Sequence, residues 1–160
     1  MQGKTHMIGG ALAAGLGVVC LSLESNAVLI PAMLLGAFGG IVPDIDHKNS
    51  KISHKTKPVS ALITLFFSHR GFFHTPILYC ALWLIWRFFT DKTSYMILGD
   101  FFFMGTFSHL ILDLLNPLGI SAFFPFWMKR IHLGHIRTGS IREMIVRMIL
   151  TTGCICLCLY

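Results

Sequence analysis

Residues 95–115 read YMILGDFFFMGTFSHLILDLL, and this stretch decides the fold class. A helix needs about 20 mostly apolar residues to cross a bilayer core of roughly 30 Å, because each residue adds about 1.5 Å. The stretch has that length, and its only charged or imidazole side chains are Asp100, His109 and Asp113. It therefore predicts a membrane-spanning helix.

The rest of the chain has the same character. The 160 residues are 54% hydrophobic and 12% charged, with a mean hydropathy of +0.70, whereas soluble domains carry about 25% charged residues. Four more apolar segments occur at 7–23, 27–42, 72–89 and 143–160. The shorter run 59–67 is expected to be an interfacial helix. We predict an all-α integral membrane bundle with four to five transmembrane helices, in a single domain covering 1–160.

The first two apolar segments each carry a ridge of small residues at every fourth position. The ridges are Gly9, Ala13 and Gly17 in the first, and Ala32, Gly36 and Gly40 in the second. Such ridges let two helix backbones approach closely within lipid. We therefore expect a tight antiparallel hairpin that turns around residues 24–26.

The basic residues predict the orientation in the membrane. Successive spans place the N-terminus and loops 43–71 and 116–142 on one face. Eleven of the 13 Lys and Arg residues fall there: Lys4, Lys48, Lys51, Lys55, Lys57, Arg70, Lys129, Arg130, Arg137, Arg142 and Arg147. Only Arg87 and Lys92 fall on the other face. The positive-inside rule makes the first face cytoplasmic. Segment 7–23 lacks a small-residue cleavage site, so we expect a retained helix.

Histidine and aspartate side chains gather at the ends of the apolar segments on that same face. The sharpest pair is His109-x-x-x-Asp113, because a four-residue spacing puts both on one helix face. Ionisable groups at this depth usually face a bundle interior or a wet cavity. The candidate metal ligands are His6, Asp44, Asp46, His69, His74, His109 and Asp113. We expect His54, His132 and His135 to be polar caps.

The candidate set mixes nitrogen and oxygen donors without thiolate, which favours zinc, with manganese or iron as alternatives. Seven donors exceed the needs of one tetrahedral ion, so two or three ions are expected. Such a site suits hydrolysis of a phosphate ester. In this hypothesis Asp46 or His74 accepts a proton from water, and the Arg70 guanidinium binds a phosphate. The substrate expected at membrane level is a phospholipid or a lipid-linked phosphate.

Several motifs together resemble the YdjM family, bacterial inner-membrane proteins associated with LexA regulation. They are Thr5-His6 before a glycine-rich helix, Pro43-Asp44-Ile45-Asp46-His47, His69-Arg70-Gly71-x-x-His74-Thr75 and Ser108-His109-Leu110-x-x-Asp113. The resemblance runs from about residue 4 to Phe126 and implies a multi-pass, metal-dependent hydrolase of the inner membrane. The family is distantly similar to zinc-dependent phospholipase C and P1-type nucleases. That similarity implies His6, Asp44, His69 and His109 as ligands, with Asp113 bridging two ions.

Two other functions stay open. Intramembrane His and Asp also mark the paths of divalent-ion or proton transporters and channels, which would need such residues toward the opposite face, where only Asp100 is available. A non-catalytic membrane scaffold, in which His and Asp tie helices together, is the second alternative. Nucleic-acid binding is not expected, because no basic, aromatic-rich motif of the known modules occurs.

Overall fold

The computed structural model describes residues 1–23, 26–46, 72–91, 93, 95–124, 126–127 and 129–159. The helices in these ranges are α1 (Gly3–Cys20), α2 (Asn26–Gly39), α5 (Pro76–Thr90), α6 (Tyr95–Leu114) and α7 (Ile141–Leu159). Two short 3-10 helices, η1 (Val42–Asp46) and η2 (Phe72–His74), lie between α2 and α5. The described residues contain no strand and only an isolated antiparallel bridge between Ile120 and Ile131. The all-α prediction is confirmed for this part of the chain.

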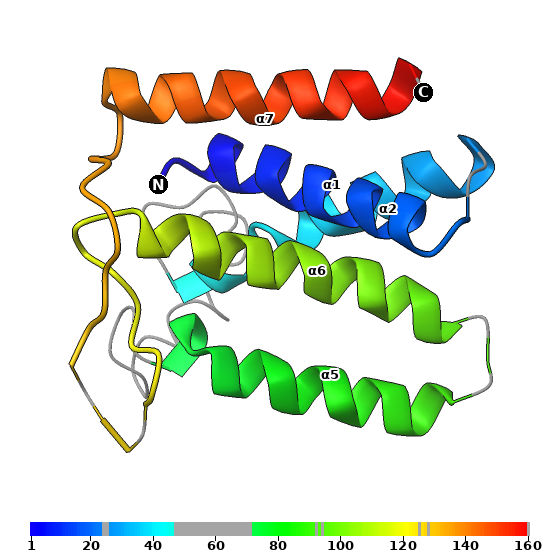
Figure 1. Cartoon of the computed structure of the whole chain (residues 1–160). Helices are drawn as coiled ribbons and strands as arrows, with labels where there is room; N and C mark the ends of the chain where they lie inside the picture. Colours follow the sequence, from blue (N-terminus) through cyan, green and yellow to red (C-terminus); the bar gives the residue numbers. More distant parts are fainter. Residues whose placement is uncertain are drawn as a thin grey trace.

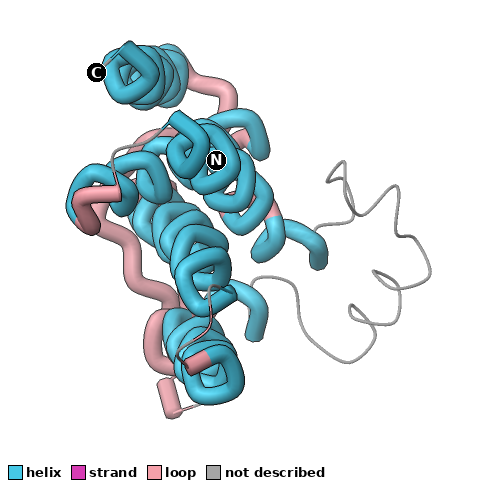
Figure 2. The backbone as a smooth tube through the Cα atoms, turned by 90° about the vertical axis from the view of Figure 1, so that its right-hand side faces the viewer, coloured by secondary structure: helices cyan, strands magenta, loops and turns pink. Residues whose placement is uncertain are grey.

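The centre of the bundle consists of α1, α2 and α6, which pack against one another (Figures 1 and 2). Helices α1 and α2 run antiparallel, as the sequence predicted. Their backbones touch where Gly10 faces Gly36, since a Cβ on either glycine would strike the carbonyl of the other. A Cβ on Gly105 of α6 would also strike the Gly36 carbonyl. The small residues therefore bring three backbones together at one level.

The predicted ridge is correct in α2 and wrong in α1. Gly36 and Gly40 face the α1 backbone, as expected. In α1, however, Gly9 and Gly17 face side chains of α6, and their neighbours Gly10 and Ala14 face α2. The reason is that α1 packs closely against both α2 and α6, so it needs small residues on both of these sides. Small residues at every fourth position identify a helix face that packs closely, but they do not identify the helix that packs against it.

The outer helices are α5, which packs on α6, and α7, which packs on α1. Figure 2, which looks nearly along the helices, shows α7 at one edge of the bundle. Both outer helices present large apolar side chains outward, including Phe88 and Phe89 of α5 and Met148 and Ile149 of α7. Extensive apolar surface of this kind is typical of membrane contact.

Two helical stretches are long and apolar enough to cross a membrane, Ala27–Asp44 and Tyr95–Leu114. Only 33% of the first stretch and 44% of the second are buried inside the protein, so most of their residues are not enclosed by protein. Helix α5 is apolar but shorter. The expected four to five spans are therefore not confirmed by length and composition. Run 59–67 lies outside the described residues.

The helix directions determine where the site is built. Helices α1, α5 and α7 begin at the end of the bundle where α2 and α6 terminate (Figure 1). The helix directions therefore agree with the predicted alternation, in which the N-terminus and the starts and ends of loops 43–71 and 116–142 lie on one side. The connecting segment 115–140 lies at the same end.

Candidate metal centre

Five of the predicted ligands come together at that end of the bundle. His6 lies in the first turns of α1, Asp44 in η1, His74 in η2, and His109 and Asp113 in the last turns of α6. We call these five side chains the His/Asp cluster. Four separate segments contribute to it, so it depends on the tertiary structure and not on one local motif.

Proline residues determine where two of these side chains lie. Pro76 is the first residue of α5, and Thr75 before it is extended, as expected for a residue that precedes proline. His74 is thereby left just outside the helix, in η2. Pro43 is the second residue of η1 and directly precedes Asp44. Each proline therefore lies within two residues of a ligand candidate.

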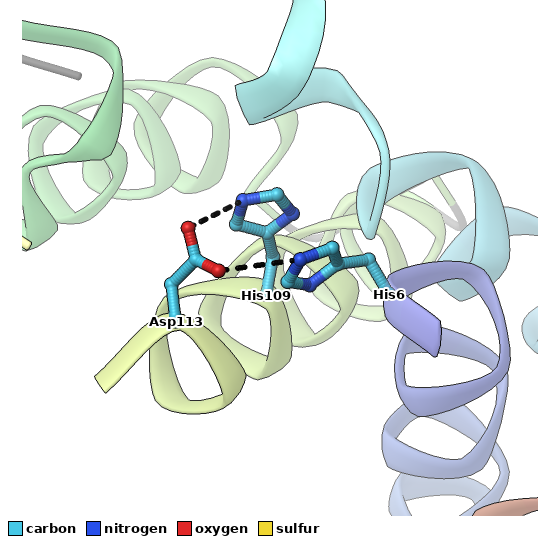
Figure 3. A group of neighbouring side chains, drawn as sticks. All are labelled: His6, His109 and Asp113. Atoms are coloured by element: carbon cyan, nitrogen blue, oxygen red, sulfur yellow. Dashed lines mark ion pairs between the residues drawn. The ribbon is translucent and has the colours of Figure 1, made fainter. Parts of the chain in front are cut away.

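The innermost part of the cluster consists of His6, His109 and Asp113, all with fully buried side chains (Figure 3). His6 Nε2 lies 3.3 Å from Asp113 Oδ1, and His109 Nε2 lies 3.7 Å from Asp113 Oδ2. The two imidazole rings stack with centroids 3.8 Å apart. One carboxylate thus faces two imidazole nitrogens, one through each oxygen.

The second part consists of Asp44, His74 and the same His109. His74 Nε2 lies 3.6 Å from Asp44 Oδ1, and His109 Nε2 lies 3.9 Å from that oxygen. His74 Nε2 is also 3.7 Å from Asp113 Oδ2, which joins the two parts. The Asp44 side chain is 15% exposed, whereas the others are fully buried. The cluster is therefore continuous and opens toward solvent on the Asp44 side.

A backbone carbonyl orients the shared histidine. His109 Nδ1 lies 2.8 Å from the carbonyl oxygen of Gly40. A carbonyl can only accept, so Nδ1 carries the proton and donates. In neutral imidazole this leaves the lone pair on Nε2, which is the nitrogen that faces Asp44 and Asp113. Histidines that bind metals usually have this kind of outer partner.

The spacings test whether the residues fit a metal. Direct hydrogen bonds between nitrogen and oxygen span about 2.7–3.2 Å, so pairs at 3.6–3.9 Å are too far apart for one. Two ligands of one tetrahedral ion stand about 3.3 Å apart when each bond is about 2.0–2.1 Å. Among the described residues, His6 Nδ1 and His109 Nε2 have no hydrogen-bond partner. The three imidazoles and two carboxylates fit a zinc-, manganese- or iron-type ion.

Two groups of three atoms are each compact enough for one ion. The donor atoms of His6, His109 and Asp113 lie within 4.8 Å of one another, and so do those of Asp44, His74 and His109. The amino nitrogen of Met1 also lies 2.8 Å from Asp113 Oδ1, so this carboxylate already faces one positive group.

The sequence reasoning missed Glu143, which is 1% exposed. Its Oε1 accepts hydrogen bonds from the Gln2 amide and the Thr5 hydroxyl, and its Oε2 accepts one from the Gly139 amide. Glu143 thus fastens the start of α7 to the start of α1, beside His6. The available signal was Ser140-x-x-Glu143 before an apolar run, a helix-capping pattern.

Several candidates do not join the described cluster. His69 and Arg70 lie outside the described residues, as do His47 and His54. Asp46 ends η1, but its side chain is likewise not described. Their assigned roles stay predictions.

The two remaining described histidines lie on the surface, and their expected role as polar caps stays a prediction. His132 and His135 are exposed and contact each other edge to face, with ring centroids 5.4 Å apart. Neither belongs to a group of described side chains compact enough to hold an ion.

Asp100, the acidic residue toward the opposite end of α6, has structural partners. Trp83 Nε1 donates to Asp100 Oδ1 at 2.7 Å, and Arg87 lies 3.4 Å from the carboxylate. The Arg87 guanidinium also stacks over the Trp83 ring. These contacts tie α5 to α6.

Comparisons with known proteins point to a membrane family. The profile of the family described as YdjM inner membrane protein matches residues 1–160. The chain is 33% identical over 148 residues to an uncharacterized protein, YvsG, of Bacillus subtilis (strain 168), a match that covers 91% of this chain and 87% of that protein. It is 28% identical over 151 residues to the inner membrane protein YdjM of Escherichia coli (strain K12), covering 83% of this chain and 74% of that protein. No solved structure matches significantly.

Proposed function

The chain belongs to the YdjM family of inner membrane proteins, and from this premise we propose that it is a membrane-bound, metal-dependent hydrolase. We assign it a phosphoester of a phospholipid or lipid-linked phosphate as substrate, at the cytoplasmic face of a bacterial inner membrane. The protein then crosses the membrane several times, with its N-terminus and its site on the cytoplasmic side.

The observation that carries the proposal is the convergence of five buried or nearly buried donors at ligand-like spacing. Burying a charged group costs several kcal/mol when its charge is not compensated, and the Met1 amino group already faces the Asp113 carboxylate. A divalent ion would offset this cost, because one ion contacts several of these donors at once. The observation supports a scaffold role less well, since the histidine–aspartate pairs at 3.6–3.9 Å are longer than hydrogen bonds.

Each residue of the cluster has a role in the proposal. His6, His109 and Asp113 would hold an ion at the buried end, with the Gly40 carbonyl keeping His109 Nε2 turned toward the carboxylates. Asp44 lies on the more open side and is where the substrate enters. His74 lies near both Asp44 and Asp113, so it can take a proton from water at the phosphorus. When bound, divalent ions would supply Lewis-acid activation of the phosphoryl group and of water.

The location of the cluster supports a lipid substrate. It lies at the terminal turns of α6, a helix long and apolar enough to cross a membrane. A site at that depth is close to the phosphate level of a leaflet, because the hydrocarbon core ends where the apolar helix ends. A phosphate carried by a lipid reaches this level without leaving the membrane, whereas a large soluble polymer does not.

The proposal is tested on protein purified in detergent, as wild type and Asp113→Ala side by side. Metal content is measured by mass spectrometry, and hydrolysis is measured with a panel of phosphomonoesters, phosphodiesters and phospholipids. We expect near-stoichiometric zinc, manganese or iron in the wild type, loss of the ion in the variant, and hydrolysis only by the loaded wild type. A folded wild type that takes up no metal after reloading would refute the metal site. Metal binding without hydrolysis across the panel would refute the enzyme and favour ion transport.

A further inference from the structure

The described residues of the connecting segment 115–140 form a loop at the end of the bundle where the His/Asp cluster lies. Ile120 and Ile131 exchange both backbone hydrogen bonds, at 3.0 and 2.9 Å, and they close the base of a loop over residues 121–130, here called the tip loop. The residues that follow the loop are hydrogen-bonded to the end of α6. The carbonyls of Leu114 and Leu115 accept from the amides of Leu133 and Ile136. The loop is therefore held at the end of the bundle where the cluster lies (Figure 1).

The tip loop presents large aromatic side chains outward. Phe126 is 88% exposed, Trp127 54% and Phe123 51%, while Ile120 at the loop base is 1% exposed. The Phe123 and Trp127 rings stack with centroids 6.2 Å apart, and the Trp127 amide donates to the Phe123 carbonyl. In contact with water, large apolar side chains are usually buried. In this loop the large aromatic side chains are exposed and the smaller Ile120 is buried.

The charges next to these rings are all positive. Lys129 and Arg130 are exposed on the same loop, and Arg137 is exposed further along. The sequence has no Asp or Glu between residues 114 and 142. Aromatic rings beside exposed cations are the side chains found at the headgroup level of membranes, where the rings enter the interface and the cations contact phosphate.

We infer that the tip loop is a docking surface for anionic phospholipid headgroups in the leaflet nearest the His/Asp cluster. The rings of Phe126 and Trp127 insert at the interface, and Lys129 and Arg130 bind the headgroup phosphates. The same composition would also suit single-stranded nucleic acid, but membership of a membrane family favours lipid. The inference does not depend on metal binding or on hydrolysis.

The test is lipid binding by the full chain in detergent, measured by native mass spectrometry with phosphatidylglycerol or phosphatidylcholine added. The variant is Lys129→Gln with Arg130→Gln. The matched control is Lys4→Gln with Arg142→Gln, which removes the same charge from exposed positions at the same end of the bundle but outside the loop. We expect the wild type to prefer phosphatidylglycerol. The loop variant should lose that preference by roughly thirtyfold, since each cation near an anionic surface contributes about 1 kcal/mol.

A second measurement follows the aromatic side chains. Brominated phosphatidylglycerol should quench a larger fraction of the tryptophan fluorescence in the wild type than in Trp127→Phe. Comparing fractions corrects for the loss of one fluorophore in the variant. Equal binding of the two lipids by the wild type, or equal losses in the loop and control variants, would overturn the inference. Tight binding of a single-stranded oligonucleotide at the loop with no lipid preference would replace lipid with nucleic acid.

Discussion

The carbonyl oxygen of Gly40 accepts the Nδ1 proton of His109 at 2.8 Å, so the residue that follows α2 orients a ring from α6. A side chain at position 40 has no room, because its Cβ would strike the carbonyl of His6. One glycine therefore controls the position of two of the three histidines in the cluster.

Gly40→Ala should weaken metal binding by about ten- to a hundredfold, which is typical when the outer partner of a ligand is disturbed. The reason is that the new methyl group displaces the carbonyl that fixes the His109 tautomer. Metal titration of the detergent-purified protein checks this. Gly3→Ala is the control, since a Cβ there meets no atom within 4 Å. Unchanged affinity in Gly40→Ala would show that the carbonyl does not orient the ligand.

Removal of metal should lower the thermal stability of the wild type. An ion present at about a hundred times its dissociation constant adds roughly 2.7 kcal/mol to the free energy of unfolding. Chelator should therefore shift the unfolding midpoint of the wild type and leave Asp113→Asn unchanged. Asp100→Asn, on the same helix, should keep the chelator response while losing baseline stability through its Trp83 and Arg87 contacts. A scaffold without metal predicts no chelator response in any of the three.

Glu143→Gln should destabilise the protein by about 1–3 kcal/mol, because one carboxylate oxygen becomes a donor and a buried amide loses its acceptor. The affected contacts hold Thr5, the neighbour of His6. Metal affinity should fall with stability. Arg147→Gln tests the same junction from a half-buried side chain, whose contact is with Gln2, and should change stability by less than about 0.5 kcal/mol. Equal effects of the two substitutions in thermal unfolding would contradict the role given to Glu143.

Gly36→Ala should destabilise the bundle by about 1–3 kcal/mol, the usual cost of overpacking. Its methyl group would meet the Gly10 carbonyl and the Ala14 methyl at once. Gly153→Ala, also within a helix, would meet only the flexible end of Leu12 and should be tolerated. The comparison is made by unfolding in detergent. A larger loss in Gly153→Ala would contradict the packing described for α1 and α2.

Much of the helix pattern could be predicted from the sequence, because long apolar runs bounded by polar residues indicate helices whatever their neighbours are. The five apolar segments correspond to α1, α2, α5, α6 and α7. Which face of α1 meets which partner could not be predicted, since Gly9 and Gly10 are both small and the choice depends on the position of α6. Membrane crossing by each helix also depends on the bilayer, which length and composition only approximate.

The ligand candidates could be predicted where short stretches of sequence place them. His109 and Asp113 are linked by helical spacing, Asp44 directly follows Pro43, and His74 lies two residues before Pro76, which begins α5. Gly40 and Glu143 were not identified, because a backbone carbonyl carries no sequence signal for its acceptor role and a glutamate in a first helical turn usually serves as a cap. Their roles arise only from contacts between distant segments.

The separation of the cluster's contributors along the chain has a consequence for biosynthesis. His6 is made early, but its partner Asp113 emerges only after α2, η1, η2 and α5 have been synthesised. A nascent chain that stops before α6 therefore lacks the carboxylate that joins both parts of the cluster. If the cluster holds an ion as proposed, ion uptake would come late in assembly, and ion binding would report that α1 and α6 have packed against each other.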